Sequence, residues 1–358
     1  MSKVCILSTV NIKHMTLVSL YTNYFDKNGI KYDIIYIDKY GSIEEIGAQE
    51  IFKFNLKIKR EWSFLRKLKH YWKFKKFALK ILKENDYDFI ITWNVFTAIM
   101  FSGYLVRKKP YKFVVNIRDI ATKFRIVLNV PLKKAIRKSA FSTVSSIGFS
   151  KYLPKYPYIE IHSLNMQVLQ DCIPHTKLKG KDGKIVITYI GYVVYYDNVY
   201  RLIKELANDK RYELRFYGQG SNLIEDYART IHAYNVKCIG RFEPSETANL
   251  IQDADIIYNL YGYGNINLDT ALSIKLYYAV YLNVPILVFK NTYMEFITNK
   301  YRIGYALENN DFSFLGDNLY EWYHNLNQEE LSAGCNEFIK EIKKSHIKLE
   351  NLLIKYIQ

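Results

Sequence analysis

Residues 185–206 read IVITYIGYVVYYDNVYRLIKEL, and this stretch decides the fold prediction for the second half of the chain. Its first six residues are apolar, aromatic or β-branched, as in a strand that is buried on both faces of a parallel sheet. Gly191 ends this run, and apolar residues with helical spacing begin near Asn198. A strand, a glycine and a helix in this order place free backbone N–H groups and the positive end of a helix dipole together, which suits a phosphate. The alternative for Gly191 is an ordinary tight turn.

The same alternation of short strands and helices extends outward in both directions. The expected strands are VCILST, YDIIYID, DFIITWN, KFVVNIRD, FSTVSS and YIEIHSL in the first half, and YELRFYGQG, VKCIG, ADIIYNLYG and VPILVFK in the second. The pattern predicts an α/β fold with two Rossmann-like, doubly wound parallel-sheet domains that face each other across a cleft. We expect an N-terminal domain at residues 1–174, a polar linker at 175–184 and a C-terminal domain at 185–328. The tail, 329–358, has helical apolar spacing and is expected to pack back on the N-terminal domain.

Positive charge is concentrated in the first half of the chain. Of the 358 residues, the first 170 include 30 Lys and Arg against 12 Asp and Glu, and the remainder include 21 against 23. We therefore expect the N-terminal domain to face an anionic partner. No nucleic-acid recognition motif is present, so we do not expect that partner to be a nucleic acid. Four dispersed cysteines and the lack of an apolar run of membrane-spanning length favour a reducing, cytoplasmic location.

Residues 60–82, REWSFLRKLKHYWKFKKFALKIL, combine basic and aromatic side chains on one predicted helix. The apolar side is expected to hold Phe64, Leu68, Tyr71, Trp72, Leu79 and Leu82, with Arg66, Lys69, His70, Lys73, Lys76 and Lys80 opposite. Three partners fit such a helix. They are the protein core beneath a solvated basic face, an anionic membrane surface and a nucleic-acid backbone.

Several stretches in order resemble glycosyltransferases of the GT-B architecture, in particular those of glycosyltransferase family 4. They are VVNIRDI, FSTVSSIGFSKYLPKYPYIEIHSLN, IVITYIGYVVYYDNVYRLIKEL, ELRFYGQGS, VKCIGRFEPSETANLIQDADIIYNLY and SIKLYYAVYLNVPILVF. The resemblance implies transfer of a hexose from a nucleotide sugar, most simply a UDP-sugar, to a lipid-linked or other glycan acceptor in bacterial surface or capsular polysaccharide assembly. It also implies retention of anomeric configuration without a metal ion or other cofactor.

The resemblance places the nucleotide sugar in the C-terminal domain. Lys275, at the start of a helix, is expected near the donor diphosphate, where its ammonium would offset the charge of the leaving nucleotide. The full expected set is Gly191, Gly218, Gly220, Arg241, Ser273, Lys275 and Tyr278. For Lys275 the alternative is a solvated lysine in the first turn of a helix, and for Arg241 it is an exposed loop residue.

The sequence departs from the family pattern at two points. Thr270 and Tyr278 stand where family 4 enzymes carry two glutamates, and Asp269 is the neighbouring carboxylate that can substitute for the first. The loop GYVVYYDN also lacks the Arg or Lys that commonly binds the diphosphate. Two other functions therefore stay open. One is a non-catalytic GT-B subunit that binds a glycan or a partner enzyme, and the other is a sugar-nucleotide epimerase.

The acceptor is expected at the N-terminal domain. Asp119 is the candidate catalytic residue that orients or deprotonates the acceptor hydroxyl, and Arg118 is the candidate for an anionic group. An internal Arg–Asp ion pair is the alternative. The remaining candidates for acceptor or sugar binding are Asn11, His14, Trp93 and Asn94.

The resemblance also favours the membrane as the partner of residues 60–82, because related enzymes that act on lipid-linked sugars often contact the bilayer through this region. We expect peripheral attachment to the inner face of the plasma membrane. The residues expected to bind the membrane are Arg66, Lys69, Trp72, Lys73 and Lys76.

Overall fold

A computed structural model describes residues 2–15, 17–41, 46–57, 61–120, 125–309 and 311–357. The chain divides into two compact units: residues 1–163 with 344–358 form the first, and residues 164–343 form the second. The first unit thus ends at Ser163, earlier than the expected boundary at 174. The reason is that Leu164, Leu169 and Cys172 are buried in the core of the second unit.

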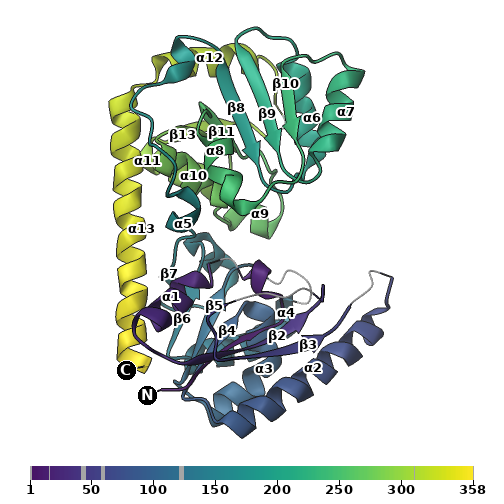
Figure 1. The fold of residues 1–358 in the computed structure, drawn as a ribbon, viewed down its shortest axis with the longest axis vertical. Helices are drawn as coiled ribbons and strands as arrows, with labels where there is room; N and C mark the ends of the chain where they lie inside the picture. The colour runs from purple at the N-terminus through teal and green to yellow at the C-terminus, as the bar shows by residue number, and fades with distance from the viewer. Residues whose placement is uncertain are drawn as a thin grey trace. The chain divides into compact units, whose positions relative to one another are not determined.

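The first unit is built on a seven-stranded parallel sheet with the order β3-β2-β1-β4-β5-β6-β7 (Figure 1). The strands are β1 (Val4–Ser8), β2 (Tyr32–Asp38), β3 (Glu50–Asn55), β4 (Phe89–Trp93), β5 (Phe113–Ile117), β6 (Phe141–Val144) and β7 (Ile159–Glu160). The helices are η1 (Ile12–His14), α1 (Ser19–Lys27), α2 (Phe64–Asn85), α3 (Val95–Lys108), α4 (Arg125–Lys138) and η2 (Ile147–Tyr152). All residues of β1, β2, β4, β5 and β6 are buried, so their continuous apolar sequences correspond to strands that are covered on both faces.

Different helices cover the two faces of this sheet. Alternate strand residues such as Ile6, Ile34 and Ile91 pack with α1 and with the end of α13 (Gln328–Ile357), which contributes Leu349, Leu353 and Ile357. On the other face lie α2, α3 and α4 (Figure 1). There the ring of Phe74 in α2 packs edge-on against Phe101 of α3, with ring centroids 5.9 Å apart.

The second unit has a six-stranded parallel sheet with the order β10-β9-β8-β11-β12-β13. The strands are β8 (Ile185–Ile190), β9 (Tyr212–Tyr217), β10 (Val236–Ile239), β11 (Ile256–Tyr258), β12 (Ile286–Phe289) and β13 (Gly304–Leu307). The helices are α5 (Met166–Leu169), η3 (Lys179–Lys181), α6 (Tyr196–Glu205), α7 (Ser221–Thr230), η4 (Pro244–Glu246), α8 (Thr247–Ile251), α9 (Ile266–Thr270), α10 (Ile274–Leu282), α11 (Tyr293–Tyr301), α12 (Leu315–Asn325) and most of α13. The prediction of two doubly wound parallel-sheet domains is confirmed.

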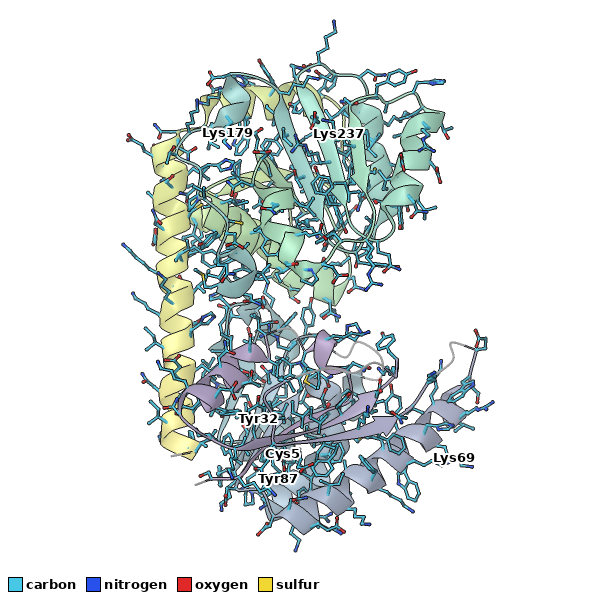
Figure 2. All side chains as sticks on the ribbon, in the orientation of Figure 1. Cys5, Tyr32, Lys69, Tyr87, Lys179 and Lys237 are labelled. Carbon is cyan, nitrogen blue, oxygen red and sulfur yellow. The ribbon has the colours of Figure 1, made fainter. Side chains whose placement is uncertain are left out.

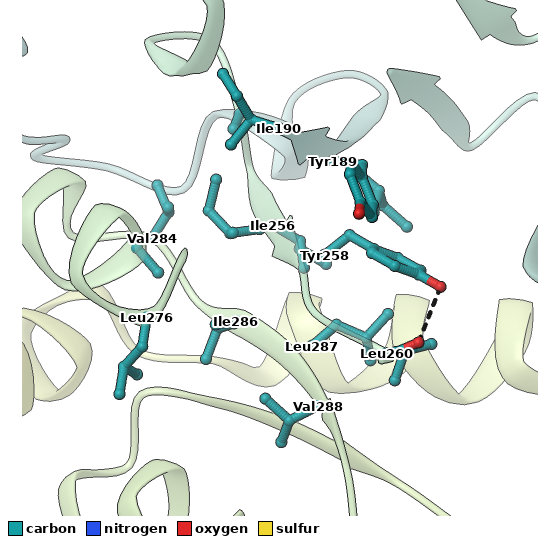
Figure 3. Packing of buried hydrophobic residues seen from close by; sticks show 14 of the residues in the cluster. Tyr189, Ile190, Ile256, Tyr258, Leu260, Leu276, Val284, Ile286, Leu287 and Val288 are labelled. Carbon is teal, nitrogen blue, oxygen red and sulfur yellow. Dashed lines mark hydrogen bonds between the residues drawn. The ribbon is translucent and has the colours of Figure 1, made fainter. Parts of the chain in front are cut away.

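The core of the second unit is aliphatic along β11 and β12 and aromatic toward the carboxyl end of β8. Figure 3 shows Ile256, Ile286 and Val288 among the packed aliphatic side chains, and Tyr189 near Tyr258. The rings of these two tyrosines are 5.4 Å apart. The Tyr258 hydroxyl donates to the carbonyl oxygen of Leu260 at 3.2 Å, which satisfies a polar group that would otherwise be buried at a cost. Tyrosine side chains therefore pack together at the carboxyl ends of the central strands β8 and β11.

Among the helices of the described residues, none combines the length and the apolar character needed to cross a bilayer.

Candidate functional site

The second sheet reverses its winding between β8 and β11, because the chain runs from β8 toward β9 and from β11 toward β12 on the other side. At such a switch point the loops that follow the two strands separate and leave a crevice at the carboxyl edge, which is where doubly wound sheets bind ligands. Here the loops begin at Gly191 after β8 and at Asn259 after β11.

Two glycines shape this edge. Gly191 has φ +107° and Gly218, after the neighbouring strand β9, has φ +139°, both in the region that favours glycine. A Cβ on Gly218 would collide with the carbonyl oxygen of Gly191, so the two turns can approach each other only because Gly218 has no side chain. Gly220, with φ +97°, directly precedes α7. The structure therefore gives all three predicted glycines a conformational reason, and two of them lie in contact at one end of the sheet.

Lys275 lies against this turn. Its side chain is 2% exposed, and its Nζ would be 3.9 Å from a Cβ built on Gly191. The ammonium donates a hydrogen bond to the Tyr261 hydroxyl and lies 4.3 Å and 4.6 Å from the ring centroids of Tyr189 and Tyr261. Within the described part of the chain, no carboxylate forms an ion pair with it. Burial lowers the pKa of Lys275 to about 7.

Ser273 positions this lysine. It is the N-cap of α10, and its Oγ accepts a hydrogen bond from the backbone N–H of Lys275 at 3.3 Å. Lys275 is therefore not the solvated first-turn lysine that the sequence left open as an alternative. A buried amine that has aromatic rings in place of carboxylates as neighbours is able to receive an anion.

Tyrosines cluster at the glycine loop, which contains no Arg or Lys. The Tyr189 hydroxyl donates to the Tyr192 carbonyl oxygen at 2.7 Å and accepts from the Val194 N–H at 3.2 Å, so it fixes the loop between β8 and α6. The ring of Tyr195, at the start of α6, lies 5.4 Å from that of Tyr261. Sequence reasoning missed this cluster, because only Tyr195 lies within GYVVYYDN, whereas Tyr189 precedes that loop and Tyr261 follows β11.

A second polar feature faces a small pocket at the same edge. The pocket has a volume of 120 Å³, and its lining consists of Asn259, Tyr261, Gly262, Asn267, Leu268, Ala271, Ser273, Phe289, Thr292 and Met294. Asn259 is 5% exposed, and its Oδ1 has no hydrogen-bond partner among the described residues. An unsatisfied buried acceptor beside a pocket is able to bind an O–H or N–H group of a ligand.

The second unit also holds two further predicted donor residues, Tyr278 and Arg241, together with Thr270 and Asp269 at or beside a family glutamate position. Tyr278 is half-buried against the core, and burial raises its pKa to about 12. Thr270 is buried and its hydroxyl donates to the Ile266 carbonyl oxygen within α9, while the carboxylate of Asp269 accepts from the Gly264 N–H at 2.8 Å. Arg241 is exposed in the segment after β10, the edge strand. No carboxylate thus occupies the positions of the two family glutamates.

In the first unit the winding reverses between β1 and β4, and predicted acceptor residues follow both strands. Asn11 is fully buried. Its Nδ2 donates to Asp38 Oδ1 at 3.0 Å and its Oδ1 accepts from the Lys39 N–H at 2.9 Å, so it joins two loops. His14 is exposed, with Nε2 3.0 Å from the Tyr40 hydroxyl.

Trp93 and Asn94 end β4 in different environments. Trp93 is a buried core residue, edge-on to Tyr21 with ring centroids 5.9 Å apart. Asn94 has φ +71° and ψ 163°, a conformation that non-glycine residues rarely adopt. Its Oδ1 holds this conformation by accepting from the Thr97 N–H at 2.9 Å as the N-cap of α3. Backbone strain at the switch point is a feature that often accompanies functional sites.

Arg118 and Asp119 follow β5. The Arg118 guanidinium donates to Ser163 Oγ at 2.6 Å. Asp119 keeps solvent-exposed surface, yet the surrounding protein desolvates its carboxylate and raises its pKa, an effect that the nearby Arg118 partly offsets. A carboxylate with a raised pKa at the end of a central strand is a suitable proton acceptor.

The buried face of the helix α2 is not the face that the sequence predicts. Its core residues are Phe74, Ala78, Ile81 and Leu82, whereas Leu68 and Trp72 are 52% and 55% exposed. Arg60 lies outside the described residues. Lys76 Nζ lies 3.7 Å from the centroid of the Trp72 ring, and the side chains of Arg66, Lys69 and Lys73 are exposed; Figure 2 shows Lys69 on α2. The expectation that Leu68 and Trp72 share a face with the buried Leu82 is therefore wrong. The five predicted membrane-binding residues lie together on the exposed surface.

No protein family model matches the chain, and no curated protein matches it either. Solved structures match over nearly its full length. Sucrose-phosphate synthase from Thermosynechococcus elongatus has a TM-score of 0.72 at 11% identity, with 99% of each chain covered. Anabaena HepE in complex with UDP has a TM-score of 0.68 at 10% identity, covering 99% of this chain and 100% of that one. The apo form of WaaB, a lipopolysaccharide outer core galactosyltransferase, has a TM-score of 0.65 at 13% identity, with 99% of each chain covered. The chain therefore has the GT-B fold of these proteins, as its resemblance to GT-B glycosyltransferases implies.

Proposed function

We propose that this protein is a glycosyltransferase that binds a nucleoside diphosphate sugar at the carboxyl edge of its second sheet. The observation that carries the proposal is Lys275, a buried amine without a carboxylate partner among the described residues, positioned against the Gly191 turn. An amine in this environment becomes favourable as a cation when a diphosphate binds beside it. The structures of HepE with UDP and with UDP-glucose support a UDP-hexose as the donor.

In this proposal the chain's own residues hold the leaving group. The Lys275 ammonium and the N-terminus of α6 offset the charge that develops on the diphosphate, and the Asn259 amide contacts the donor beside them. Asp119 orients or deprotonates the acceptor hydroxyl. We propose that no metal is required, because Lys275 and the N-terminus of α6 can offset the charge of an anionic leaving group. Retention of configuration is what the resemblance to family 4 implies.

The proposed acceptor is a lipid-linked glycan of surface polysaccharide assembly, reached from the cytoplasmic face of a membrane. The support is the exposed surface of α2, where Leu68 and Trp72 accompany Lys69, Lys73 and Lys76. Aromatic and leucine side chains enter the bilayer interface, and each nearby cation adds about 1 kcal/mol at an anionic leaflet.

A direct binding measurement tests the donor site. Isothermal titration with UDP, GDP and dTDP is expected to give micromolar affinity for one nucleotide. Lys275→Ala is expected to weaken it at least tenfold, since an interaction with a charged group is worth about 1.5–3 kcal/mol. Lys204→Ala, an exposed lysine on α6, is the matched control and is expected to bind as the wild type does.

The absence of the family glutamates favours one rival function. Thr270 and Tyr278 occupy those positions, and both are committed to internal contacts. If no nucleotide binds to the wild-type protein at millimolar concentration, the donor-site proposal is wrong and a non-catalytic GT-B subunit becomes the better description.

A further inference from the structure

A groove of 650 Å³ lies between α2 and α3 in the first unit. Its lining residues are Lys75, Leu79, Lys83, Asp86, Gly103, Tyr104, Arg107, Lys108 and Lys109. Five of these nine residues are cationic and one is acidic, so the groove carries a strong positive charge.

Of the five cations of the groove, only one is paired with a carboxylate in the part of the chain that the structure describes. Lys109 is buried, and its Nζ donates to Asp86 Oδ1 at 2.7 Å and to the Tyr87 carbonyl oxygen at 2.6 Å. The one acidic residue of the groove is thus already paired. Lys83, Arg107 and Lys108 form no ion pair within the described residues.

Helix dipoles explain some of these cations but not the groove as a whole. Lys83, Arg107 and Lys108 lie in the last turns of their helices, where cations interact favourably with the dipole. Lys75 is in the middle of α2, where the dipole gives no such benefit. A groove whose cations converge from two helices therefore points to an anionic ligand.

The groove is separate from the proposed acceptor site. The C-termini of α2 and α3 lead into β4 and β5, so this end of the groove lies at the amino edge of the sheet. Asp119 and Asn94 follow the carboxyl ends of β5 and β4, at the opposite edge. The ligand of the groove is therefore not the group that reacts.

The groove continues the exposed apolar surface of α2. Leu68, Trp72, Lys75, Leu79 and Lys83 follow one another at spacings of three or four residues, which places them in one row along the helix. A second groove, of 410 Å³, shares Gly103 and Arg107 with the first and extends to the exposed Val130 and to Lys134 of α4. Apolar side chains suited to a bilayer interface thus flank a basic groove on the same side of the unit.

We propose that the α2–α3 groove binds the phosphate headgroup of an anionic lipid while Leu68 and Trp72 enter the bilayer interface. The inference rests on the membrane contact of the proposed function and adds a headgroup site to it. A phosphate accepts several charge-assisted hydrogen bonds. The Arg107 Nε already donates to the Gly103 carbonyl oxygen at 2.9 Å, and the two terminal guanidinium nitrogens are able to donate to the phosphate. Lys83 and Lys108 then supply the remaining donors.

Vesicle flotation tests the groove. The full-length protein is mixed with phosphatidylcholine vesicles, with and without phosphatidylglycerol. The wild type is expected to float only with the anionic vesicles. The double variant Lys83→Gln with Arg107→Gln is expected to partition roughly thirtyfold more weakly, because each cation near the leaflet contributes about fivefold.

The control is Lys27→Gln with Lys31→Gln, which makes the same change in net charge. These lysines are exposed at the end of α1 and just before β2, and α1 lies on the opposite face of the sheet. Their loss is expected to change partition by less than about threefold, because salt screens distant charges. Thermal unfolding checks each variant, and Lys75→Gln with Lys108→Gln replaces the groove pair if that pair unfolds.

The outcomes separate the headgroup site from the function on which it rests. Equal losses for the groove and control variants, or equal binding of the wild type to both kinds of vesicle, would overturn the headgroup site. A wild type that floats with neither kind of vesicle would overturn the membrane contact as well. UDP affinity is expected to be unchanged in the groove variants.

Discussion

Lys275 is the residue on which the proposed chemistry depends. Its amine is buried among tyrosine rings, which accept a cation through their faces but do not neutralise it as a carboxylate would. With a pKa of about 7, the side chain divides between neutral and charged forms near neutral pH. A bound diphosphate favours the charged form, so binding and protonation are coupled.

The coupling predicts the pH dependence of nucleotide binding. Above pH 7 the free protein loses the Lys275 proton and the complex keeps it, so the dissociation constant for UDP is expected to rise by up to about tenfold per pH unit. Titration in buffers of different ionisation enthalpy is expected to show proton uptake. Lys275→Ala is expected to remove both effects, and a wild-type affinity that stays constant from pH 7 to pH 9 would contradict the coupling.

Gly218 provides a second test at this scale. Gly218→Ala combines a positive φ with a collision against the Gly191 carbonyl, and it is expected to lower the free energy of unfolding by about 2 kcal/mol or more. Gly183→Ala is the control, since a Cβ there meets no atom within 4 Å. Urea denaturation compares the two variants, and similar stabilities would show that the glycine turn is not constrained as described.

At the scale of elements, α2 shows why an amphipathic pattern alone misassigns a face. The helix has two apolar rows, one containing Leu68 and Trp72 and the other containing Phe74 and Ala78. The sequence cannot tell which row packs on the sheet. The structure assigns the core to the second row, since Phe74 packs against Phe54 of β3 and Phe101 of α3. Trp72 therefore stays exposed on the surface of α2, where it is available to the proposed membrane contact.

The two rows predict opposite phenotypes. Phe74→Ala is expected to cost about 3–5 kcal/mol of stability by leaving a cavity. Trp72→Ala is expected to leave the free energy of unfolding within about 1 kcal/mol but to reduce partition to anionic vesicles severalfold. Denaturation and vesicle flotation distinguish these outcomes. A strongly destabilised Trp72→Ala would show that this ring packs on the protein.

The sequence predicts the buried strands but not every strand of each sheet. Buried strands such as β1 and β8 are continuous apolar runs and were predicted from sequence. The edge strand β3, EIFKFN, was not predicted, because it is partly exposed and carries Glu and Lys. The edge strand β13, GYAL, was also not predicted, whereas the edge strands β7 and β10 lie within the predicted runs YIEIHSL and VKCIG.

At the scale of the whole molecule, the helix α13 contributes to both compact units. Phe338 and Ile342 belong to the core of the second unit, and Leu349 and Leu353 belong to that of the first. The division of the chain at residues 343 and 344, within this helix, has no sequence punctuation. The expected boundary at 328 instead marked the start of the helix. Boundaries here depend on which core buries each apolar residue, and this is a property of the folded chain.

This shared helix gives a prediction for stability. Leu353→Ala is expected to destabilise the first unit by about 2–5 kcal/mol, because the leucine is fully buried. The adjacent Ile354 is exposed, and Ile354→Ala is expected to cost less than about 1 kcal/mol. Hydrogen exchange of β1 and β4 reports on the first unit. Equal protection of these strands in both variants would contradict the assignment of α13 to that core.

The candidate site was only partly predictable for a related reason. Gly191, Gly218 and Lys275 follow from strand ends and a helix start, which the sequence marks locally. The tyrosines around Lys275 come from β8 and from the loop after β11, far apart in sequence, and only the sheet order brings them together. The unsatisfied Asn259 amide likewise has meaning only in the folded protein.

The most direct test of the central claim is a crystal structure of the protein with UDP. The diphosphate is expected to lie at the carboxyl edge of the second sheet, within hydrogen-bond distance of Lys275 Nζ and beside the Gly191 turn. A nucleotide bound elsewhere, with Lys275 still directed at the Tyr261 hydroxyl, would contradict the assignment of this site.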